Sequence, residues 1–323
     1  MYNIAIIGAG QLGSRHLQAL VQVKHEIKIQ VVDSSIESLT VAETRFNEVA
    51  SNFTGKISFH EKITELDKQL DVVIIATSSK VRRVVLEQLV ENSKVKNLIL
   101  EKVLFTKLED YPSVQKLITS HSIKTWVNCP RRMMSYYQKI AQEISGPVHF
   151  MATGNAWGMG CNGIHFLDLF AFISKSKDIV LSNHLIDKEI IESKRSGYIE
   201  ITGTLTGSSS DSSFHLTSFP NNSSPISVVI NSPTARYFIE ESPLAKVRVS
   251  KLENNWKWQE EEFTMPFQSQ LTAAVVNELI ETGTCHLTTY EESTVLHLAF
   301  LNNLISFMKQ VNSDNTIEEC LIT

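Results

Sequence analysis

Three glycines near the start of the chain, and one acid after them, have types and spacing suited to binding a phosphate-containing ligand. Gly8, Gly10 and Gly13 form a Gly-x-Gly-x-x-Gly pattern directly after the apolar run Asn3–Ile7, and Asp33 follows about 20 residues later. Gly8 permits a tight turn, Gly10 lets the main chain approach a pyrophosphate, and Gly13 allows close helix packing. The free N–H groups of a helix that starts here would attract the anion. The pattern predicts a dinucleotide site.

Asp33 bears on which dinucleotide is bound. Its carboxylate would accept hydrogen bonds from a ribose diol and repel a 2′-phosphate, and the following Ser34-Ser35 offers no arginine to neutralise one. The sequence therefore favours NAD over NADP. The alternative is a glycine-rich turn followed by a helix-capping or solvated aspartate.

The elements that must position these residues alternate in the first part of the chain. Apolar strand candidates alternate with helical patterns there, which is typical of a parallel sheet covered by helices. The strand candidates are 3–7, 27–32, 56–59, 71–76, 97–100 and 125–128, and the helix candidates between them are 36–50, 81–90 and 112–120.

The pattern changes after about residue 129. Alternating apolar and polar residues between 199 and 258 predict antiparallel strands, with the Ser- and Asn-rich stretches 207–213 and 221–224 as hairpin tips. Further candidates are helices at 136–144, 163–173, 271–281 and 291–309 and a strand at 147–153.

Composition excludes several function classes. Thirty Lys plus Arg against thirty-five Asp plus Glu give a net charge of -5, and no block of like charge suggests a nucleic-acid or membrane partner. The chain contains no CxxC pair, the pattern that would predict a zinc site, and its cysteines do not suggest a disulfide scaffold, so no metal is expected. The N-terminus lacks the features of a secretory signal and no apolar run could span a bilayer, so we expect a soluble, cytoplasmic protein. The cysteines are Cys129, Cys161, Cys285 and Cys320.

Several motifs resemble one enzyme family, that of glucose-fructose oxidoreductase, inositol dehydrogenase and MocA, and the likeness spans essentially the whole chain. The motifs are Gly8, Gly10, Gly13 and His16, then Glu101-Lys102-Val103, Val127-Asn128 with Arg131-Arg132, and Gly163-Ile164-His165-Phe166-Leu167-Asp168.

The resemblance implies a fold and an activity. It implies an α/β protein with an N-terminal Rossmann domain over 1–128 and a C-terminal α+β domain over 129–323, whose mainly antiparallel open sheet mediates a homodimer or homotetramer. It also implies NAD(P)-dependent hydride transfer to or from the CH-OH group of a sugar, sugar derivative or cyclitol. Two alternatives on the same fold are a non-catalytic dinucleotide-binding sensor or assembly protein, and an imine or enone reductase.

Lys102 and His165 are the expected catalytic residues. An ammonium at the end of a parallel strand can stabilise a developing alkoxide, and imidazole exchanges protons near neutral pH. The alternatives are a solvated lysine and a histidine that only packs in the core. The sequence departs from the family at Cys161, where an aspartate is common, at Val103, where a proline is common, and at Arg82, where a histidine is often found.

The remaining expected site residues surround these two groups. Arg131 could hold a substrate carboxylate or form a salt bridge, Asp168 could orient His165 or stabilise a helix start, and Trp157 could stack on a sugar or only pack. The expected substrate-binding residues are Asn162, Asp168, Arg131 and Trp157. The expected cofactor-binding residues are Gly8, Gly10, Gln11, Leu12, Gly13, Asp33, Ala76, Thr77, Ser78, Glu101 and Lys102.

Overall fold

The computed structural model describes all residues, 1–323, and divides the chain into two compact units. The first unit comprises 1–105, 109–130 and 266–291, and the second comprises 106–108, 131–265 and 292–323. No helix is long and apolar enough to cross a membrane.

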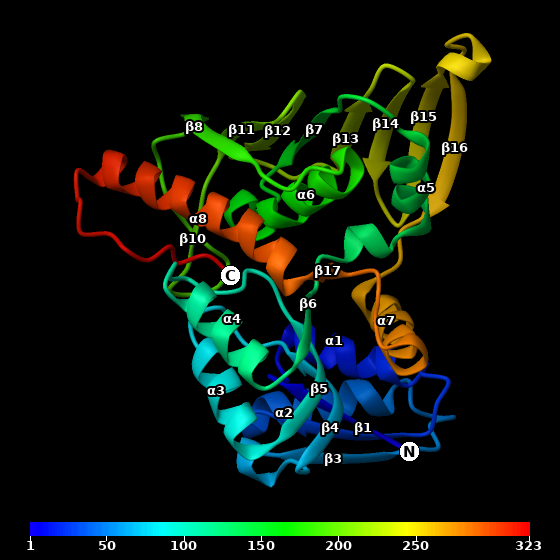
Figure 1. The fold of residues 1–323 in the computed structure, drawn as a ribbon, viewed down its shortest axis with the longest axis vertical. Helices are drawn as coiled ribbons and strands as arrows, with labels where there is room; N and C mark the ends of the chain where they lie inside the picture. Colours follow the sequence, from blue (N-terminus) through cyan, green and yellow to red (C-terminus); the bar gives the residue numbers. More distant parts are fainter. The chain divides into compact units, whose positions relative to one another are not determined.

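The first unit contains a seven-stranded sheet in the order β17-β6-β5-β4-β1-β2-β3, parallel except for β17 (Figure 1). Its central strands are continuous apolar runs because both faces of the sheet are covered. The strands are β1 (Tyr2–Ile7), β2 (Ile27–Val32), β3 (Lys56–His60), β4 (Gln69–Ile75), β5 (Lys94–Leu100), β6 (Lys124–Val127) and β17 (Thr288–Thr289). The helices are α1 (Gln11–Leu20), α2 (Ile36–Asn47), α3 (Arg82–Asn92), α4 (Asp110–Ser120) and α7 (Gln268–Thr282).

The second unit contains an eight-stranded sheet in the order β16-β15-β14-β13-β7-β12-β11-β8. All neighbours are antiparallel except β7 and β12, which are parallel. The strands are β7 (His149–Asn155), β8 (Val180–Ile186), β11 (Gly203–Ser209), β12 (Ser212–Phe219), β13 (Ile226–Asn231), β14 (Ala235–Glu241), β15 (Leu244–Lys251) and β16 (Gln259–Thr264). The other elements are α5 (Ser135–Glu143), α6 (Met159–Ser174), α8 (Tyr290–Asn312, which begins in the first unit) and a small ladder of β9 (Ile191–Glu192) and β10 (Ile199–Glu200).

These two architectures confirm the predicted fold class. Two details differ from the sequence-based expectation. Residues 266–291 pack with the first unit, although a single division at 128/129 assigned them to the second domain. The stretch 221–224 is not a hairpin tip, because β7 lies between β12 and β13 in the sheet.

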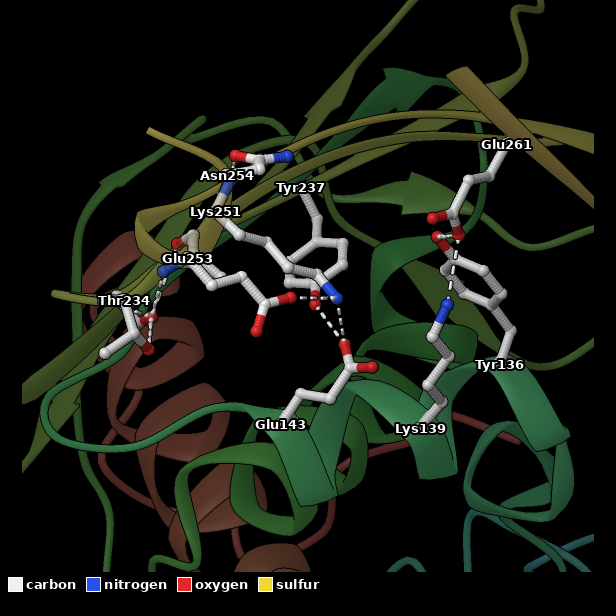
Figure 2. Close-up of polar contacts among 11 residues, drawn as sticks. Tyr136, Lys139, Glu143, Thr234, Tyr237, Lys251, Glu253, Asn254 and Glu261 are labelled. Carbon is white, nitrogen blue, oxygen red and sulfur yellow. Dashed lines mark hydrogen bonds and ion pairs between the residues drawn. The ribbon is translucent and has the colours of Figure 1, made fainter. Parts of the chain in front are cut away.

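Helix α5 is joined to the sheet of the second unit by tyrosine–glutamate hydrogen bonds (Figure 2). Tyr237 of β14 and Lys251 of β15 donate to one oxygen of Glu143 on α5, at 2.7 and 2.9 Å. In the reverse direction, Tyr136 of α5 donates to Glu261 of β16 at 2.7 Å. Without these bonds, the packing of α5 on the sheet would leave polar groups without partners. The bonds therefore fix the helix on the sheet.

Candidate functional site

The glycine turn between β1 and α1 is shaped by close contacts of the main chain. Gly8 has a φ of +95°, and a Cβ there would lie 2.9 Å from the Thr77 nitrogen. A Cβ at Gly13 would lie 1.8 Å from the carbonyl oxygen of Gly8. A Cβ at Gly10 would meet nothing within 4 Å. The fold itself thus requires glycine at 8 and 13, whereas at position 10 only a ligand approaching the main chain would require it.

Asp33 is held at the end of β2 beside this turn. Its Oδ2 accepts from the main-chain N–H of Ala9 at 2.7 Å, and its Oδ1 accepts from Ser35 at 2.9 Å. Asp33 lines a cavity of about 670 Å³, here called the Asp33 cavity, together with Gly8, Ser34 and Thr77. Two backbone donors therefore fix the carboxylate in the wall of a cavity large enough for a nucleoside.

The Asp33 cavity fits the adenosine part of a dinucleotide. The Oγ1 atom of Thr77 in its wall is buried and has no hydrogen-bond partner, so a ligand group can satisfy it. Main-chain N–H groups at the first turn of α1, including those of Gln11 and Leu12, have no partner within the helix and can hold the pyrophosphate. The side chain of Gln11 instead accepts from Arg45 of α2 at 2.7 Å.

The other expected cofactor residues lie at the ends of the neighbouring strands. Ala76 donates its N–H to Ile7 at 2.8 Å and packs against Gly13, and Ser78 begins the turn into α3. Glu101 and Lys102 follow β5, the strand beside β4. Of the expected cofactor residues, Gly8, Asp33 and Thr77 line the Asp33 cavity; the rest belong to the α1 start or the strand ends.

Glu101 belongs to a closed ring of buried hydrogen bonds. Its Oε1 contacts His16 Nε2 at 2.8 Å and accepts from the amide of Asn128. The His16 Nδ1 atom contacts Thr272 at 2.8 Å, and Gln268 joins Thr272 to Asn128 at 3.1 and 3.0 Å. The ring fixes the main chain immediately before Lys102.

Burial alone would raise the pKa of Glu101, but the hydrogen bond and charge of His16, the charge of Lys102 and the bond from Asn128 hold it below the ordinary value. The ring therefore stabilises an ionised carboxylate beside Lys102. Sequence reasoning missed Thr272 and Gln268, since nothing in a single sequence indicates that α7 returns to the first unit.

Arg82 fixes the main chain after Lys102. The peptide bond from Lys102 to Val103 is cis although no proline is present. The buried guanidinium of Arg82 donates to the carbonyl groups of Val103, Leu104 and Thr77. The residue that departs from the family pattern thus ties the Lys102 segment to the strand end at Thr77.

In the second unit, two of the expected substrate ligands are engaged by protein groups. Asp168 is fully buried and accepts two hydrogen bonds from Arg132, at 2.9 and 2.7 Å. Arg131 makes a similar two-point contact with Glu241, at 2.9 and 2.6 Å. The salt-bridge alternative for Arg131 is therefore the arrangement observed, and we leave both Arg131 and Asp168 out of the proposed substrate site.

His165, Asn162 and Trp157 lie on or just before α6. His165 is half-buried and lies about one turn after Cys161, whose thiol donates to the carbonyl of Thr323. Asn162 donates to the Trp157 carbonyl at 2.7 Å, and the Trp157 indole donates to Thr217 at 2.8 Å. Asn162 and Trp157 line a cavity of about 320 Å³ within this unit.

Residues 2–129 match the family model described as an oxidoreductase family with an NAD-binding Rossmann fold (GFO_IDH_MocA). No curated protein matches the chain.

Solved structures similar to this chain have low sequence identity and therefore bear on the fold alone. One is an oxidoreductase from Agrobacterium radiobacter in complex with NAD+, L-tartaric acid and magnesium (14% identity, 93% of this chain and 94% of that one, TM-score 0.73). Another is a mutant 3-ketoreductase from Actinomadura kijaniata in complex with TDP-benzene and NADP (13%, 93% and 96%, TM-score 0.65). A third is the transcriptional regulator Gal80p from Kluyveromyces lactis (11%, 98% and 93%, TM-score 0.69).

Proposed function

We propose that this chain, whose residues 2–129 match the model of an oxidoreductase family with an NAD-binding Rossmann fold, transfers a hydride between NAD and a sugar-like alcohol or its ketone. The observation that carries the proposal is the pairing of an unhindered Gly10 main chain with the fixed Asp33 carboxylate. The fold leaves open space around Gly10, and together the two features suit a pyrophosphate and a ribose without a 2′-phosphate.

When bound, the nicotinamide supplies the hydride acceptor or donor. Lys102 then hydrogen-bonds the substrate oxygen and its ammonium stabilises charge that develops there. Its main chain is held at the end of β5 by the bonds of Glu101 before it and of Arg82 after it. His165 accepts the hydroxyl proton during oxidation or returns it during reduction. Trp157 and Asn162 bind the rest of the substrate.

Two measurements test this proposal. Calorimetric titration with NADH measures whether the protein binds the cofactor, and the absence of binding at millimolar NADH would refute the proposal. A panel of sugars, cyclitols and their ketones, followed by NADH absorbance, examines turnover. Lys102→Met should abolish turnover, while NADH still binds through the turn before α1 and Asp33. Lys96 is an exposed lysine on the same strand, so Lys96→Met should change neither turnover nor NADH binding.

A second candidate function is a dinucleotide-binding sensor without catalysis. Cys161 favours it, because a thiol is a weak hydrogen-bond group where the family resemblance expects an acid, and a transcriptional regulator is among the similar structures. NADH binding without turnover of any member of the panel would support the sensor over the enzyme.

The open face of the second unit's sheet is our proposed self-association surface. Phe238 and Met151 are 48% and 42% exposed, and Val229 lies between them in register. Light scattering should give the molar mass of a dimer or tetramer. Phe238→Glu should shift the oligomer toward the monomer, since association would bury a charge. A monomeric wild-type protein would contradict this part of the proposal.

A further inference from the structure

Arg82, the first residue of α3, joins two parts of the first unit that the proposed chemistry uses. Its guanidinium donates to the carbonyl of Thr77, in the wall of the Asp33 cavity, and to the carbonyls of the two residues that follow Lys102. We infer that Arg82 is a positioning residue through which occupation of the Asp33 cavity fixes the segment that carries Lys102. The inference rests on the proposed function, because it takes the Asp33 cavity as the adenosine site and Lys102 as the catalytic group.

The segment 103–105, directly after Lys102, is buried and receives hydrogen bonds from side chains. All three of its residues are fully buried. Arg82 Nη1 donates to the first two carbonyls, that of Leu104 at 2.8 Å, and the Tyr111 hydroxyl donates to the third at 3.1 Å. Because a buried carbonyl without a donor is unfavourable, Arg82 restricts where the main chain after Lys102 can lie.

The other end of the guanidinium is bound at the wall of the Asp33 cavity. Arg82 Nη2 donates to the Thr77 carbonyl. The main-chain nitrogen of Thr77 lies close to the glycine turn, since a Cβ at Gly8 would be 2.9 Å from it. The Thr77 Oγ1 atom is buried and has no hydrogen-bond partner. A ligand that bonds this hydroxyl therefore restrains the residue whose carbonyl Arg82 holds.

An arginine suits this connection because of the geometry of its donors. The guanidinium is planar and carries several N–H groups in fixed directions, so the three carbonyls that it binds are held in one arrangement. A neutral imidazole has a single N–H, and the donors of an ammonium rotate. The Arg82 residue is 1% exposed, which shields its bonds from solvent. Position 82, where the resemblance expects a histidine, thus supplies a connection that histidine would not.

Hydrogen exchange of main-chain amides in the full-length protein tests the inference, with ADP as the probe. ADP carries adenosine and a pyrophosphate but no nicotinamide, so protection near Lys102 cannot come from a nicotinamide contact. In the wild type, we expect saturating ADP to slow exchange about fivefold or more at 76–79 and also at 102–105. In Arg82→Met, saturating ADP should still slow exchange at 76–79 and should leave 102–105 unchanged.

Arg83→Met is the matched control. Arg83 is the next residue of α3, and its guanidinium bonds instead to Glu87 and Asp110, at 2.9 and 2.7 Å. This variant loses the same type of side chain from the same helix, so saturating ADP should protect both segments as in the wild type.

Thr77→Val provides a second test that leaves Arg82 in place and applies even if Arg82→Met does not fold. The hydroxyl that it removes bonds no protein group, so the variant should be as stable as the wild type. At saturating ADP, exchange should still slow at the turn 8–13, but no longer at 102–105.

Steady-state kinetics separates positioning from a general loss of structure. Arg82→Lys keeps the charge but not the planar group. With any substrate that the panel identifies, it should lower kcat per NADH-binding site about tenfold or more, because misplacement of a catalytic group slows the chemical step. A merely structural role would lower the melting temperature and the number of NADH-binding sites, and would leave kcat per site unchanged.

The inference is overturned if millimolar ADP does not bind the wild type, or if bound ADP leaves 102–105 unprotected. It is also overturned if Arg82→Met or Thr77→Val retains that protection. Protection without turnover of any panel member would refute the proposed enzyme and support the inference. Turnover by a wild type in which ADP binds without protecting 102–105 would overturn the inference and leave the proposed function standing.

Discussion

Substitution of Gly10 by alanine should separate cofactor binding from folding. Gly10 has φ −61° and ψ −162°, which alanine can adopt, and a Cβ there meets no atom within 4 Å. Gly→Ala at such a position raises the free energy of unfolding by about 0.4–1 kcal/mol, because the unfolded chain loses freedom. Gly10→Ala should therefore be as stable as the wild type or slightly more stable.

The same methyl group should impair NADH binding. It projects where the pyrophosphate must approach the first turn of α1, and loss of one hydrogen bond to a charged group is worth about 1.5–3 kcal/mol. Since about 1.4 kcal/mol is a factor of ten, the dissociation constant for NADH should rise roughly 10- to 150-fold.

Gly13→Ala is the matched comparison. Its Cβ would lie 1.8 Å from the Gly8 carbonyl oxygen, which no side-chain movement can relieve. Overpacking of this kind costs about 1–3 kcal/mol or more, so this variant should lose stability as well as NADH binding. Urea denaturation and calorimetric NADH titration on both variants provide the measurements. A Gly10→Ala protein that binds NADH as tightly as the wild type would refute our reading of the turn.

Three further predictions concern individual side chains. Asp33→Asn should weaken NADH binding and reduce the protein's preference for NADH over NADPH, because the carboxylate that repels a 2′-phosphate is removed. Calorimetric titration with both cofactors measures the two affinities, and an unchanged ratio between them would contradict the role assigned to Asp33. Asp168→Asn should lower the free energy of unfolding by about 3–5 kcal/mol, because the mostly buried Arg132 keeps its charge and loses the carboxylate that pairs with it. A loss below about 1 kcal/mol in urea denaturation would contradict this. Burial, then the hydrogen bond and charge of Glu143, raise the pKa of Tyr237. The contribution of protonated Tyr237 to the free energy of unfolding is therefore full below the ordinary tyrosine pKa of about 10 and declines as the pH rises above it. In urea denaturation at alkaline pH, the midpoint of Tyr237→Phe should consequently fall less with rising pH than the midpoint of the wild type.

Local signals in the sequence predicted the first unit well. Gly8, Gly13 and Asp33 act within one strand–turn–helix–strand segment, and their roles follow from backbone geometry that neighbouring residues determine. The parallel strands were recognisable as apolar runs because both faces of the sheet are buried.

Contacts between segments that are far apart in the chain could not be predicted from a single sequence. Asp168 was expected either to orient His165 on the same helix or to stabilise the helix start. It is held instead by Arg132, and the acid at the start of α6 is Glu200 from β10. Likewise, β7 pairs between β12 and β13, whose paired residues lie 64 and 74–82 positions later in the chain. Such pairings depend on tertiary packing, which periodicity does not encode.

The return of α7 to the first unit constrains how this protein can be synthesised. Thr272 and Gln268 close the buried ring around His16 and Glu101, so a ribosome-bound chain that has emerged only as far as residue 130 holds an incomplete core. The N-terminal unit must wait until residues 268–282 have been synthesised before its final helix can dock, whereas domains generally fold as they emerge. An expression fragment ending at residue 130 would consequently expose the His16–Glu101 pair and should be prone to aggregation.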